Sequence, residues 1–381
     1  MQRNSGNRNR SWKLANFSVV RWGFLATVAL LAMASVGEAQ RSEEPKDLSK
    51  WGLHCFCITA VRTPHGIVQM DDNGRILYRA RGGVTREELG REGIAATESQ
   101  ILLMETYGLL EEKGGTLRTS IPVMGEERMS ALRAELKPLA KQAADALKPE
   151  VAQIREELRR QHLEESQYAI VFGYGLDGLM WDDLKAEHRL PSTELTVQHP
   201  FWRGAFWAVY PERKGVAGTN EVKARTGTMV LTWNDRTSAA LYKLEVAGGL
   251  PEAIDSLSRG GTEPVQIDAA TKWIFRDGSG LKVPVIREDA GDVLYEASRR
   301  IGSKVANQLV ESAAGKKVLA SMDGMTREEA VLIAAHELIW SIADEMVEEG
   351  VLTRPRALTD GPLGAPDVRP LVFVKVPMPG H

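Results

Sequence analysis

The chain of 381 residues is poor in cysteine and has little net charge. Two cysteines are too few for a disulfide framework, and a formal net charge of −3 gives no polybasic surface. Beyond the N-terminal region, no apolar run of about 20 residues predicts a membrane-spanning helix. The 43% of hydrophobic residues is close to the globular average, which argues against disorder. We therefore expect a globular protein, which at this length has two or three domains.

The motifs of common catalytic and nucleotide-binding sites are also missing. The chain has no P-loop, no GxGxxG after a predicted strand and no GxSxG. His336 and Glu337 begin an HExxH pattern, but Trp340 stands where the second metal-binding histidine is required. His336 lies instead on an apolar stripe of a predicted helix, which favours a core histidine. No specific reaction is predicted, and no cofactor is expected.

Residues 1–39 have the pattern of a secretory signal peptide. Positions 1–21 contain five basic residues and no acidic one, and the uncharged run 22–36 follows. Gly37 and Ala39 are small residues at the −3 and −1 positions of a cleavage site after Ala39. At about 1.5 Å per residue, this run is shorter than the roughly 30 Å hydrocarbon core. A cleaved signal is therefore favoured over an uncleaved anchor, and we expect a periplasmic or secreted protein.

Cleavage after Ala39 leaves a more acidic chain. The remaining 342 positions contain 43 basic and 50 acidic residues, a net charge of −7. Such a chain lacks the positive surface that attracts nucleic acid or anionic lipid. It also has no Asn-x-Ser/Thr glycosylation site, which favours a bacterial origin. We expect a protein partner in the cell envelope, no nucleic acid, and no membrane association after cleavage.

The predicted elements indicate an α+β protein with three parts after the signal peptide. The first part, residues 40–165, begins with a polar linker and a buried strand over 51–61. Asn73-Gly74 predicts a tight hairpin turn before a second strand at 75–79. Thr85 and Thr97 open helices, and Gly114-Gly115 predicts a hairpin. A helical stretch at 126–165 follows, which Pro138 and Pro149 should kink or divide into two or three helices.

The second and third parts are residues 166–286 and 287–381. The second is a central unit rich in aromatic residues, with a short helix at 181–189 and an antiparallel sheet formed by strands at 201–210, 226–233 and 240–246. Gly173-Tyr-Gly175 is a weak turn signal in this unit. The third part has helices at 290–314 and 326–349 and a final strand at 371–376.

Residues 85–165 resemble a winged-helix module of the MarR or ArsR type. The resemblance rests on element order: two helices, the tight exit YGLL, a Gly-Gly hairpin and a long helix. It implies DNA binding by the second helix. However, residues 92–112 contain five glutamates and no lysine or arginine, so that region would repel phosphates. We therefore expect its surface to serve protein contacts or structure. The glutamates are Glu92, Glu98, Glu105, Glu111 and Glu112.

Cys55 and Cys57 are the first candidate site, with His54 and His65 nearby. Three interpretations are open: a metal site of these four residues, a local disulfide in an oxidising compartment, or two buried small hydrophobic residues in a core strand. On a regular strand the Cα atoms of same-face neighbours are about 6.6–6.8 Å apart, which is the upper limit for a disulfide.

The second candidate site is an acidic cluster in the central unit. Paired carboxylates of this kind can serve glycoside or phosphoester hydrolysis, or bind a divalent cation. They also suit the first turn and solvated face of a short helix. The cluster consists of Asp177, Asp182, Asp183, Glu187 and His188; the catalytic candidates are Asp177, Asp182, Asp183 and His188.

The third candidate is the aromatic run at 201–210. Strand alternation places Phe201 and Trp207 on one face and Trp202, Phe206 and Tyr210 on the other. If one face is open, the run forms a ligand-binding platform; if both are covered, it is core. The platform candidates are Trp202, Phe206, Trp207 and Tyr210, with Trp233 and Trp273 as further aromatic residues.

Two functional hypotheses follow from these observations. The first is an exported soluble protein that binds or scaffolds another molecule of the cell envelope without catalysis. The alternative is a periplasmic hydrolase, with or without a metal, that uses the acidic cluster at 177–188.

Overall fold

The computed structural model describes residues 43–260, 276–277, 280–362 and 364–378. The predicted signal peptide and Trp273 lie outside these residues. The described residues contain both helices and strands, so the protein is of the α+β class. Glu44–His381 form one compact unit. Within the described ranges, no helix is long and apolar enough to cross a membrane.

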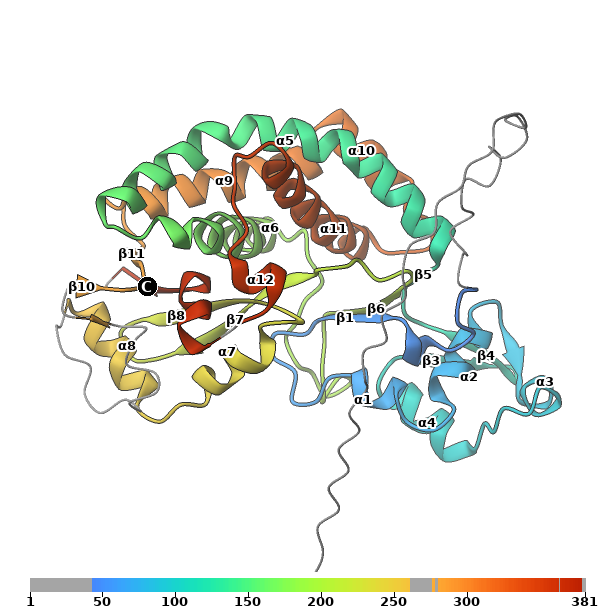
Figure 1. The fold of residues 1–381 in the computed structure, drawn as a ribbon. Coiled ribbons are helices and arrows are strands. Elements are labelled where there is room, and N and C mark those ends of the chain that lie inside the picture. Colours follow the sequence, from blue (N-terminus) through green and yellow to red (C-terminus); the bar gives the residue numbers. More distant parts are fainter. Residues whose placement is uncertain (1–42, 261–275, 278–279, 363, 379–381) are drawn as a thin grey trace, which may run out of the picture. The chain divides into compact units, whose positions relative to one another are not determined.

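One three-stranded sheet contributes to two hydrophobic cores (Figure 1). Its order is β1 (Gly52–Phe56), β6 (Ala205–Val209), β5 (Val123–Met124), with β6 antiparallel to β1 and parallel to β5. All five residues of β6 are buried. Because successive side chains of a strand point to opposite faces, Phe206 packs in the smaller core and Trp207 in the larger. We call these the small core and the large core.

The large core is built around three helices, α5 (Glu126–Arg160), α9 (Val293–Val310) and α11 (Arg327–Glu348). Figure 1 shows α5 bent over the other two. It continues through Pro138 and Pro149 as one helix, so the predicted division does not occur, and bending accommodates the two lost hydrogen bonds. The predicted boundaries at 165/166 and 286/287 fall between segments that share this core.

A second sheet and a buried helical segment complete the large core. The sheet has the order β11 (Val285–Arg287), β12 (Val372–Val376), β8 (Thr228–Asn234), β7 (Ala217–Lys223), and only the β11–β12 pair is parallel. The segment η3 (Ala169–Leu179) is π-helical and packs against α9. A Cβ at Gly173 would lie 2.4 Å from Thr232 Oγ1. This glycine therefore allows close packing of a helix, and the predicted turn is wrong.

The small core lies among short elements. Their order is α1 (His65–Val68), α2 (Asn73–Ala80), β2 (Val84–Thr85), α3 (Arg86–Arg91), α4 (Glu98–Thr106), β3 (Leu110–Lys113) and β4 (Thr116–Thr119), and the sheet order is β2-β4-β3. The helices α3 and α4 begin after Thr85 and Thr97, where the sequence predicted helices to open, and each threonine forms a capping box.

Two predicted strands are helices. The segment predicted as a strand at 75–79 lies in α2, where Ile76, Leu77 and Ala80 are buried on one helical face. The segment predicted at 240–246 lies in α7 (Ser238–Glu245), with Leu241 and Leu244 buried. The strand predicted over 51–61 ends at Phe56. The remaining elements are η1 (Leu48–Lys50), η2 (Glu164–Ser166), α6 (Met180–Ala186), α8 (Leu250–Ser258), β9 (Arg276–Asp277), β10 (Gly280–Leu281), α10 (Ala313–Ala320), α12 (Arg356–Asp360) and η5 (Ala365–Leu371).

Candidate binding pocket and disulfide

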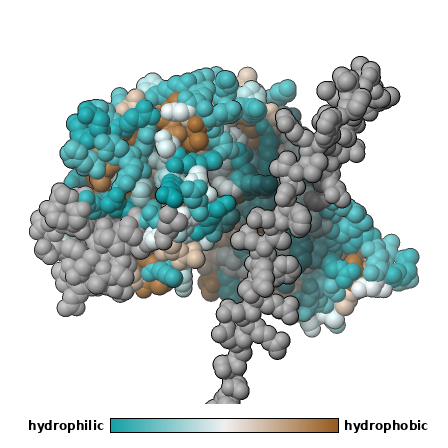
Figure 2. Space-filling model, viewed as in Figure 1, coloured by the Kyte–Doolittle hydropathy of each residue, from teal (hydrophilic) through white to brown (hydrophobic). Residues whose placement is uncertain are grey.

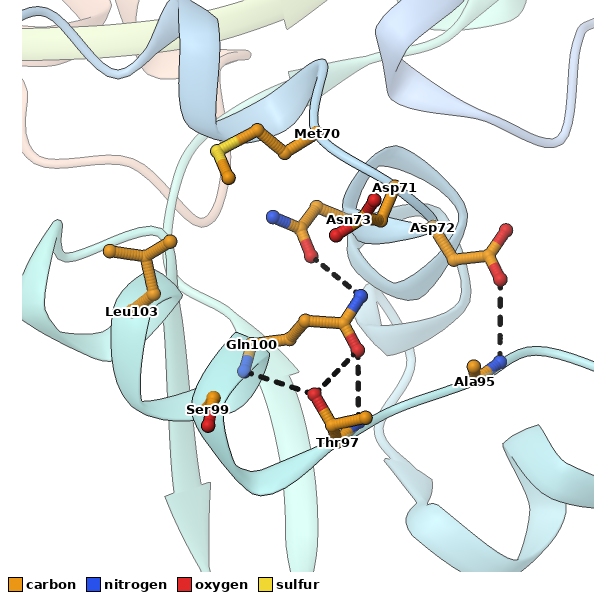
Figure 3. A pocket seen from close by; sticks show the side chains of 9 residues that line it. All are labelled: Met70, Asp71, Asp72, Asn73, Ala95, Thr97, Ser99, Gln100 and Leu103. Carbon is orange, nitrogen blue, oxygen red and sulfur yellow. Dashed lines mark hydrogen bonds between the residues drawn. The ribbon is translucent and has the colours of Figure 1, made fainter.

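A pocket of about 370 Å³ lies between the start of α2 and the start of α4 (Figure 3). Its walls combine apolar side chains with acidic and amide groups, a composition typical of small binding sites. We call it the α2–α4 pocket. Its lining residues are Met70, Asp71, Asp72, Asn73, Ala95, Thr97, Ser99, Gln100 and Leu103.

Hydrogen bonds fix the polar side of this pocket. Asn73 is 1% exposed; its amide donates to the carbonyl of Ile67 at 2.7 Å, and its Oδ1 accepts from Gln100 at 3.3 Å. Gln100 also accepts the backbone N–H of Thr97 at 3.0 Å. One buried asparagine thus joins α1, α2 and α4. We therefore expect the pocket to be preformed.

The rim of the pocket is acidic, and an apolar side chain is exposed next to it on α4. Asp71 is exposed and forms no ion pair among the described residues, whereas Asp72 pairs with Arg75 at 2.9 Å. Leu102 on α4 is 61% exposed. Met70, which lines the pocket ahead of α2, is 45% exposed. Single exposed apolar residues are normal on protein surfaces, whereas larger contiguous apolar patches mark interaction sites.

The structure places the five predicted glutamates in two groups. Three of them form ion pairs with cations that lie outside the segment 92–112. The pairs are Glu92 with Arg79, Glu111 with Lys113 and Glu112 with Arg86. Glu98 and Glu105 form none in the described part of the chain, and both are exposed on α4. The uncompensated negative charge of this region is therefore concentrated on α4.

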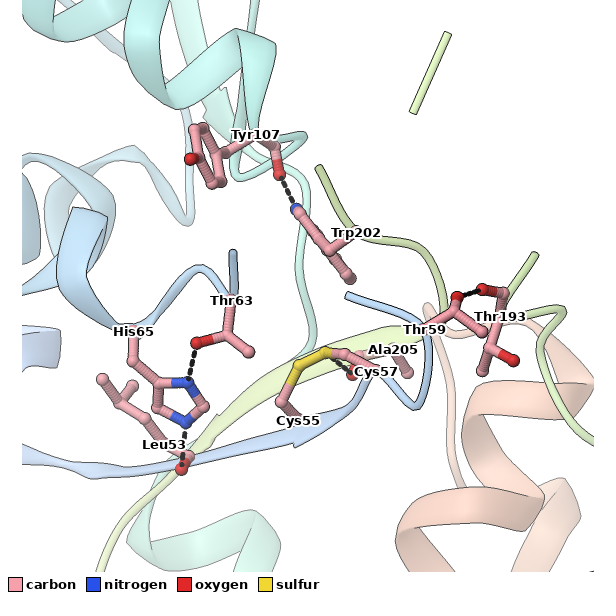
Figure 4. Close-up of a disulfide and its surroundings, with 10 residues drawn as sticks. All are labelled: Leu53, Cys55, Cys57, Thr59, Thr63, His65, Tyr107, Thr193, Trp202 and Ala205. Atoms are coloured by element: carbon pink, nitrogen blue, oxygen red, sulfur yellow. Dashed lines mark hydrogen bonds between the residues drawn. A yellow bond between two sulfur atoms is a disulfide. The ribbon is translucent and has the colours of Figure 1, made fainter. Parts of the chain in front are cut away.

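Cys55 and Cys57 form a disulfide (Figure 4), so the structure has the second of the three predicted alternatives. Their Cα atoms are 5.5 Å apart, closer than on a regular strand, because β1 ends at Phe56 and the chain turns at Cys57. The bridge closes a loop of only three residues. In the chain-entropy model such a loop contributes about 1.6 kcal/mol, against about 4.7 kcal/mol for 100 residues.

The loop after the disulfide is held against residues 190–204. The carbonyl of Phe201 accepts the N–H groups of Val61 and Arg62 at 2.8 and 3.2 Å, and the hydroxyl of Thr59 donates to the carbonyl of Thr193. Gly204 has a φ of +135°, and a Cβ there would lie 1.8 Å from the Phe56 carbonyl oxygen. The two loops thus pack backbone against backbone beside the disulfide.

His54 and His65 do not join the cysteines in a metal site. The His54 ring stacks on Trp207 at 5.4 Å, on the large-core side of β1, whereas Cys55 packs against the small core. Burial lowers the pKa of His54 to about 4. His65 contacts the Leu53 carbonyl and Thr63. No group of three metal-binding side chains occurs among the residues that the structure describes.

The aromatic run lies within the two cores. Trp207 and Phe206 are 2% and 1% exposed on opposite faces of β6, so neither face of this strand is an open platform. Trp202 donates its indole N–H to the carbonyl of Tyr107 at 2.9 Å, and Tyr210 packs on Trp51. Trp233 hydrogen-bonds to Asn220. These contacts make the four platform candidates packing residues in the described structure.

His336 is a core histidine, as its sequence context predicted. It packs against Trp181 and Trp207 at ring distances of 4.5 and 5.1 Å, and burial lowers its pKa to about 4. The neighbouring Glu337 is 3% exposed and accepts two hydrogen bonds from Arg133, at 2.9 and 3.1 Å. A nearby groove of about 490 Å³ is lined by Arg133, Lys137, Glu212, Arg213, Lys214, Ser341, Asp344 and Glu345.

The members of the acidic cluster are dispersed. Asp177 accepts hydrogen bonds from Trp181 and Thr219, both at 3.0 Å, and burial raises its pKa to about 6. Asp182 and Asp183 lie in the first turn of α6, Asp182 exposed and Asp183 partly buried. His188 is exposed, and Glu187 pairs with Arg189. Among the described residues, the backbone N–H of Glu187 donates to the carbonyl of Asp183 at the end of α6, but no side-chain hydrogen bond or ion pair joins two members.

The α2–α4 pocket was not predicted from the sequence. Met70 and Leu103 are 33 positions apart, and the segment at 71–74 was assigned to a hairpin turn. The apolar run at 101–104 predicts buried residues but does not show which of them face outward; Ile101 and Met104 are buried, whereas Leu102 is exposed. The chain matches no protein-family model, no curated protein and no solved structure.

Proposed function

We propose that this protein is exported and binds another protein of the cell envelope at the α2–α4 pocket, without catalysis. The observation on which this depends is an acidic rim, at Asp71 and Asp72, beside the apolar side chain of Met70. Exposed Glu98 and Leu102 lie on α4, the helix that forms one wall of the pocket. A polypeptide segment with an apolar side chain between lysines or arginines complements both features. The pocket contains no nucleophile paired with a base, so its chemistry suits binding.

We further propose that residues 73–119 form a winged-helix-like unit adapted to protein contacts. Its order of elements, helix, strand, two helices and two strands, supports this assignment, and so does its sheet order β2-β4-β3. The helix that would bind DNA corresponds to α4. Because Glu98 and Glu105 are exposed there, a phosphate backbone would be repelled and a basic polypeptide attracted.

A binding measurement with defined peptides tests the pocket. The probe is a fluorescein-labelled peptide with a leucine between two lysines, and its counterpart has glutamates in place of the lysines. We expect the basic peptide to bind, more weakly at high salt, and the acidic one not to bind. Asp71→Lys and Glu98→Lys should each weaken binding about tenfold, since attraction becomes repulsion.

A matched variant on another surface provides the control. Glu156 is exposed on α5. Figure 2 shows a mainly hydrophilic surface over this helix. Glu156→Lys makes the same change in net charge as Glu98→Lys, so it should leave peptide affinity unchanged. Equal weakening by both variants would show that net charge alone attracts the peptide, and would refute the pocket.

The proposed export has its own test. Sequencing of the native protein from its N-terminus should begin at Gln40, and fractionation should find the protein outside the cytoplasm. A chain that retains Met1 in the cytosol would refute export. The disulfide supports the proposal, because bridges persist mainly in oxidising compartments.

One observation favours the alternative of a periplasmic hydrolase. Burial raises the pKa of Asp177 to about 6, near the range in which a general acid acts. Hydrolysis of nitrophenyl glycosides or phosphates, abolished in Asp177→Asn and retained in Asp182→Asn, would support this alternative. Absence of turnover with and without added divalent metal would leave binding as the function.

A further inference from the structure

We propose that the Cys55–Cys57 disulfide exchanges with the thiols of a partner polypeptide that lies on the apolar loops beside it. This activity goes beyond the proposed binding function and does not depend on the α2–α4 pocket. The two cysteines are the only ones in the chain, so no other thiol of the protein can reduce or reshuffle the bridge. Its redox partner must therefore come from another molecule.

The position of the bridge argues against a purely structural role. It joins residues two apart, so it connects no separate elements and constrains the unfolded chain very little. Both cysteines are only partly buried. β1 is already held by its antiparallel pairing with β6, in which Cys55 lies opposite Phe206. The fold therefore does not need this bridge, and opening it moves only the short turn after Phe56.

The loops next to the bridge form an exposed apolar surface. Ile58 and Val61, in the loop after Cys57, are 66% and 69% exposed. In the loop 190–204 that packs on it, Leu195 and Val197 are 36% and 93% exposed. The backbone hydrogen bonds from Val61 and Arg62 to Phe201 join these loops. An extended polypeptide with apolar side chains can thus lie across them next to the sulfur atoms.

The surroundings of the two sulfur atoms determine the order of the exchange. Cys55 packs against the small core, whereas Cys57 lies beyond the end of β1, with its Sγ 3.9 Å from the carbonyl oxygen of Ala205 and exposed Ile58 next in the chain. A partner thiolate attacks Cys57 Sγ, forms a mixed disulfide and releases Cys55 as a thiolate. The partner's second thiolate then attacks the partner sulfur that is bonded to Cys57. This forms the partner's disulfide and releases Cys57 as a thiolate. The two protons from the partner's thiols end on Cys55 and Cys57, so the partner is oxidised by two electrons and the bridge is reduced.

Thiol counting provides the first test. The protein as purified should show no free thiol, either folded or unfolded in denaturant without reductant. Dithiothreitol should then produce two thiols in the folded protein within minutes, with the far-ultraviolet circular dichroism unchanged. Two thiols before reduction, or a bridge that resists dithiothreitol until the protein unfolds, would overturn the proposal.

A reduced peptide tests exchange with a polypeptide. The probe has two cysteines two residues apart, flanked by leucine and valine, and mass spectrometry follows its oxidation. We expect one peptide disulfide per protein bridge reduced. The double variant Ile58→Ser/Val61→Ser should slow this reaction at least fivefold and change the rate with dithiothreitol less than twofold. Reaction with dithiothreitol but not with the peptide would refute a polypeptide substrate.

Single-cysteine variants test which sulfur is attacked. With an oxidised form of the same peptide, Cys55→Ser leaves Cys57 free to form the mixed disulfide, and it should do so at least tenfold faster than Cys57→Ser. The reverse order would overturn the assignment of Cys57 as the outer sulfur. The variant without either cysteine should lose all exchange but keep its affinity for the basic peptide, which separates failure of this inference from failure of the proposed function.

Discussion

The two hydrophobic cores differ in where their charged groups lie. The large core packs around Glu337, His336 and Asp177, which are buried or partly buried and held by specific partners. The small core contains no buried carboxylate among its described residues, and its one partly buried histidine, His65, packs edge-on against Phe206; the carboxylates around this core lie nearer the surface. Charge is therefore part of the packing in the large core, whereas around the small core it remains available for contacts with other molecules.

The largest expected effect is on the free energy of unfolding, and it tests whether the two cores unfold together or separately. Phe206 and Phe172 are 1% and 0% exposed in the small and large cores. Each change to alanine should lower the free energy of unfolding by about 3–5 kcal/mol. Because β6 contributes to both cores, we expect one cooperative transition in denaturant for either variant. Two separate transitions in Phe206→Ala would show that the small core unfolds alone.

The next effect compares a buried ion pair with an exposed one. Arg133→Ala removes the bidentate partner of Glu337 in the large core, and Arg86→Ala removes the exposed partner of Glu112. Because Arg213 also contacts Glu337, at 3.4 Å, we expect a loss of about 2 kcal/mol for the first and less than about 1 kcal/mol for the second, measured by urea unfolding. Similar losses in both variants would contradict the distinction between the cores.

The acid sensitivity of the protein should come from the large core. Burial lowers the pKa of His336 to about 4, so the unfolded chain binds this proton more tightly than the folded one. The corresponding stability is complete above pH 6.5 and is lost as the pH falls toward 4. Between pH 7 and pH 5, protonation of His336 should lower the free energy of unfolding of the unmodified protein by about 2 kcal/mol. The variant His336→Phe should not show this loss. An equal loss in both proteins would contradict this assignment.

Asp177 should have the opposite pH dependence. Its raised pKa means that the folded state binds the proton more tightly, so protonation stabilises the fold as the pH falls through about 6. Asp177→Asn should remove about 1 kcal/mol of stabilisation between pH 7 and pH 5. The measurement is the same pair of urea titrations, and an unchanged pH profile would show that Asp177 titrates normally.

The smallest expected effect on stability is at the proposed contact surface. Leu102→Ala should change the free energy of unfolding by less than about 0.5 kcal/mol, because 61% of the side chain is exposed. The same variant should weaken binding of the basic peptide several-fold. Loss of stability without loss of binding would place Leu102 in the packing of the small core and not in a contact surface.

The sequence predicted the local features of the fold better than the assembly of its parts. The helix starts predicted at Thr85, Thr97 and Thr326 are confirmed, and each has a capping box, which depends only on side chains three residues apart. The hairpin at Asn73-Gly74 is wrong for a tertiary reason. A Cβ at Gly74 would lie 2.1 Å from Asp47 Oδ1, so this glycine allows α2 to approach η1. No local pattern contains that information.

The candidate sites show the same limit. The sequence singled out Cys55 and Cys57 but left their state open, since the answer depends on where β1 ends. It grouped Asp177 with Asp182 because they are close in the chain, whereas Asp177 is bound to Trp181 and Thr219. The α2–α4 pocket combines residues from 70 to 103, and sequence periodicity does not show that such segments meet.

The shared strand β6 has a consequence for how this protein can change over time. Its alternating side chains belong to different cores, with Phe206 on one side and Trp207 on the other. Insertion of a single residue inside the strand, between Ala205 and Phe206, would shift the following side chains by one position. The rings of Phe206 and Trp207 would then exchange between cores of different size. Lineages that retain this fold should therefore tolerate length variation in the loop 190–204 but not within 205–209.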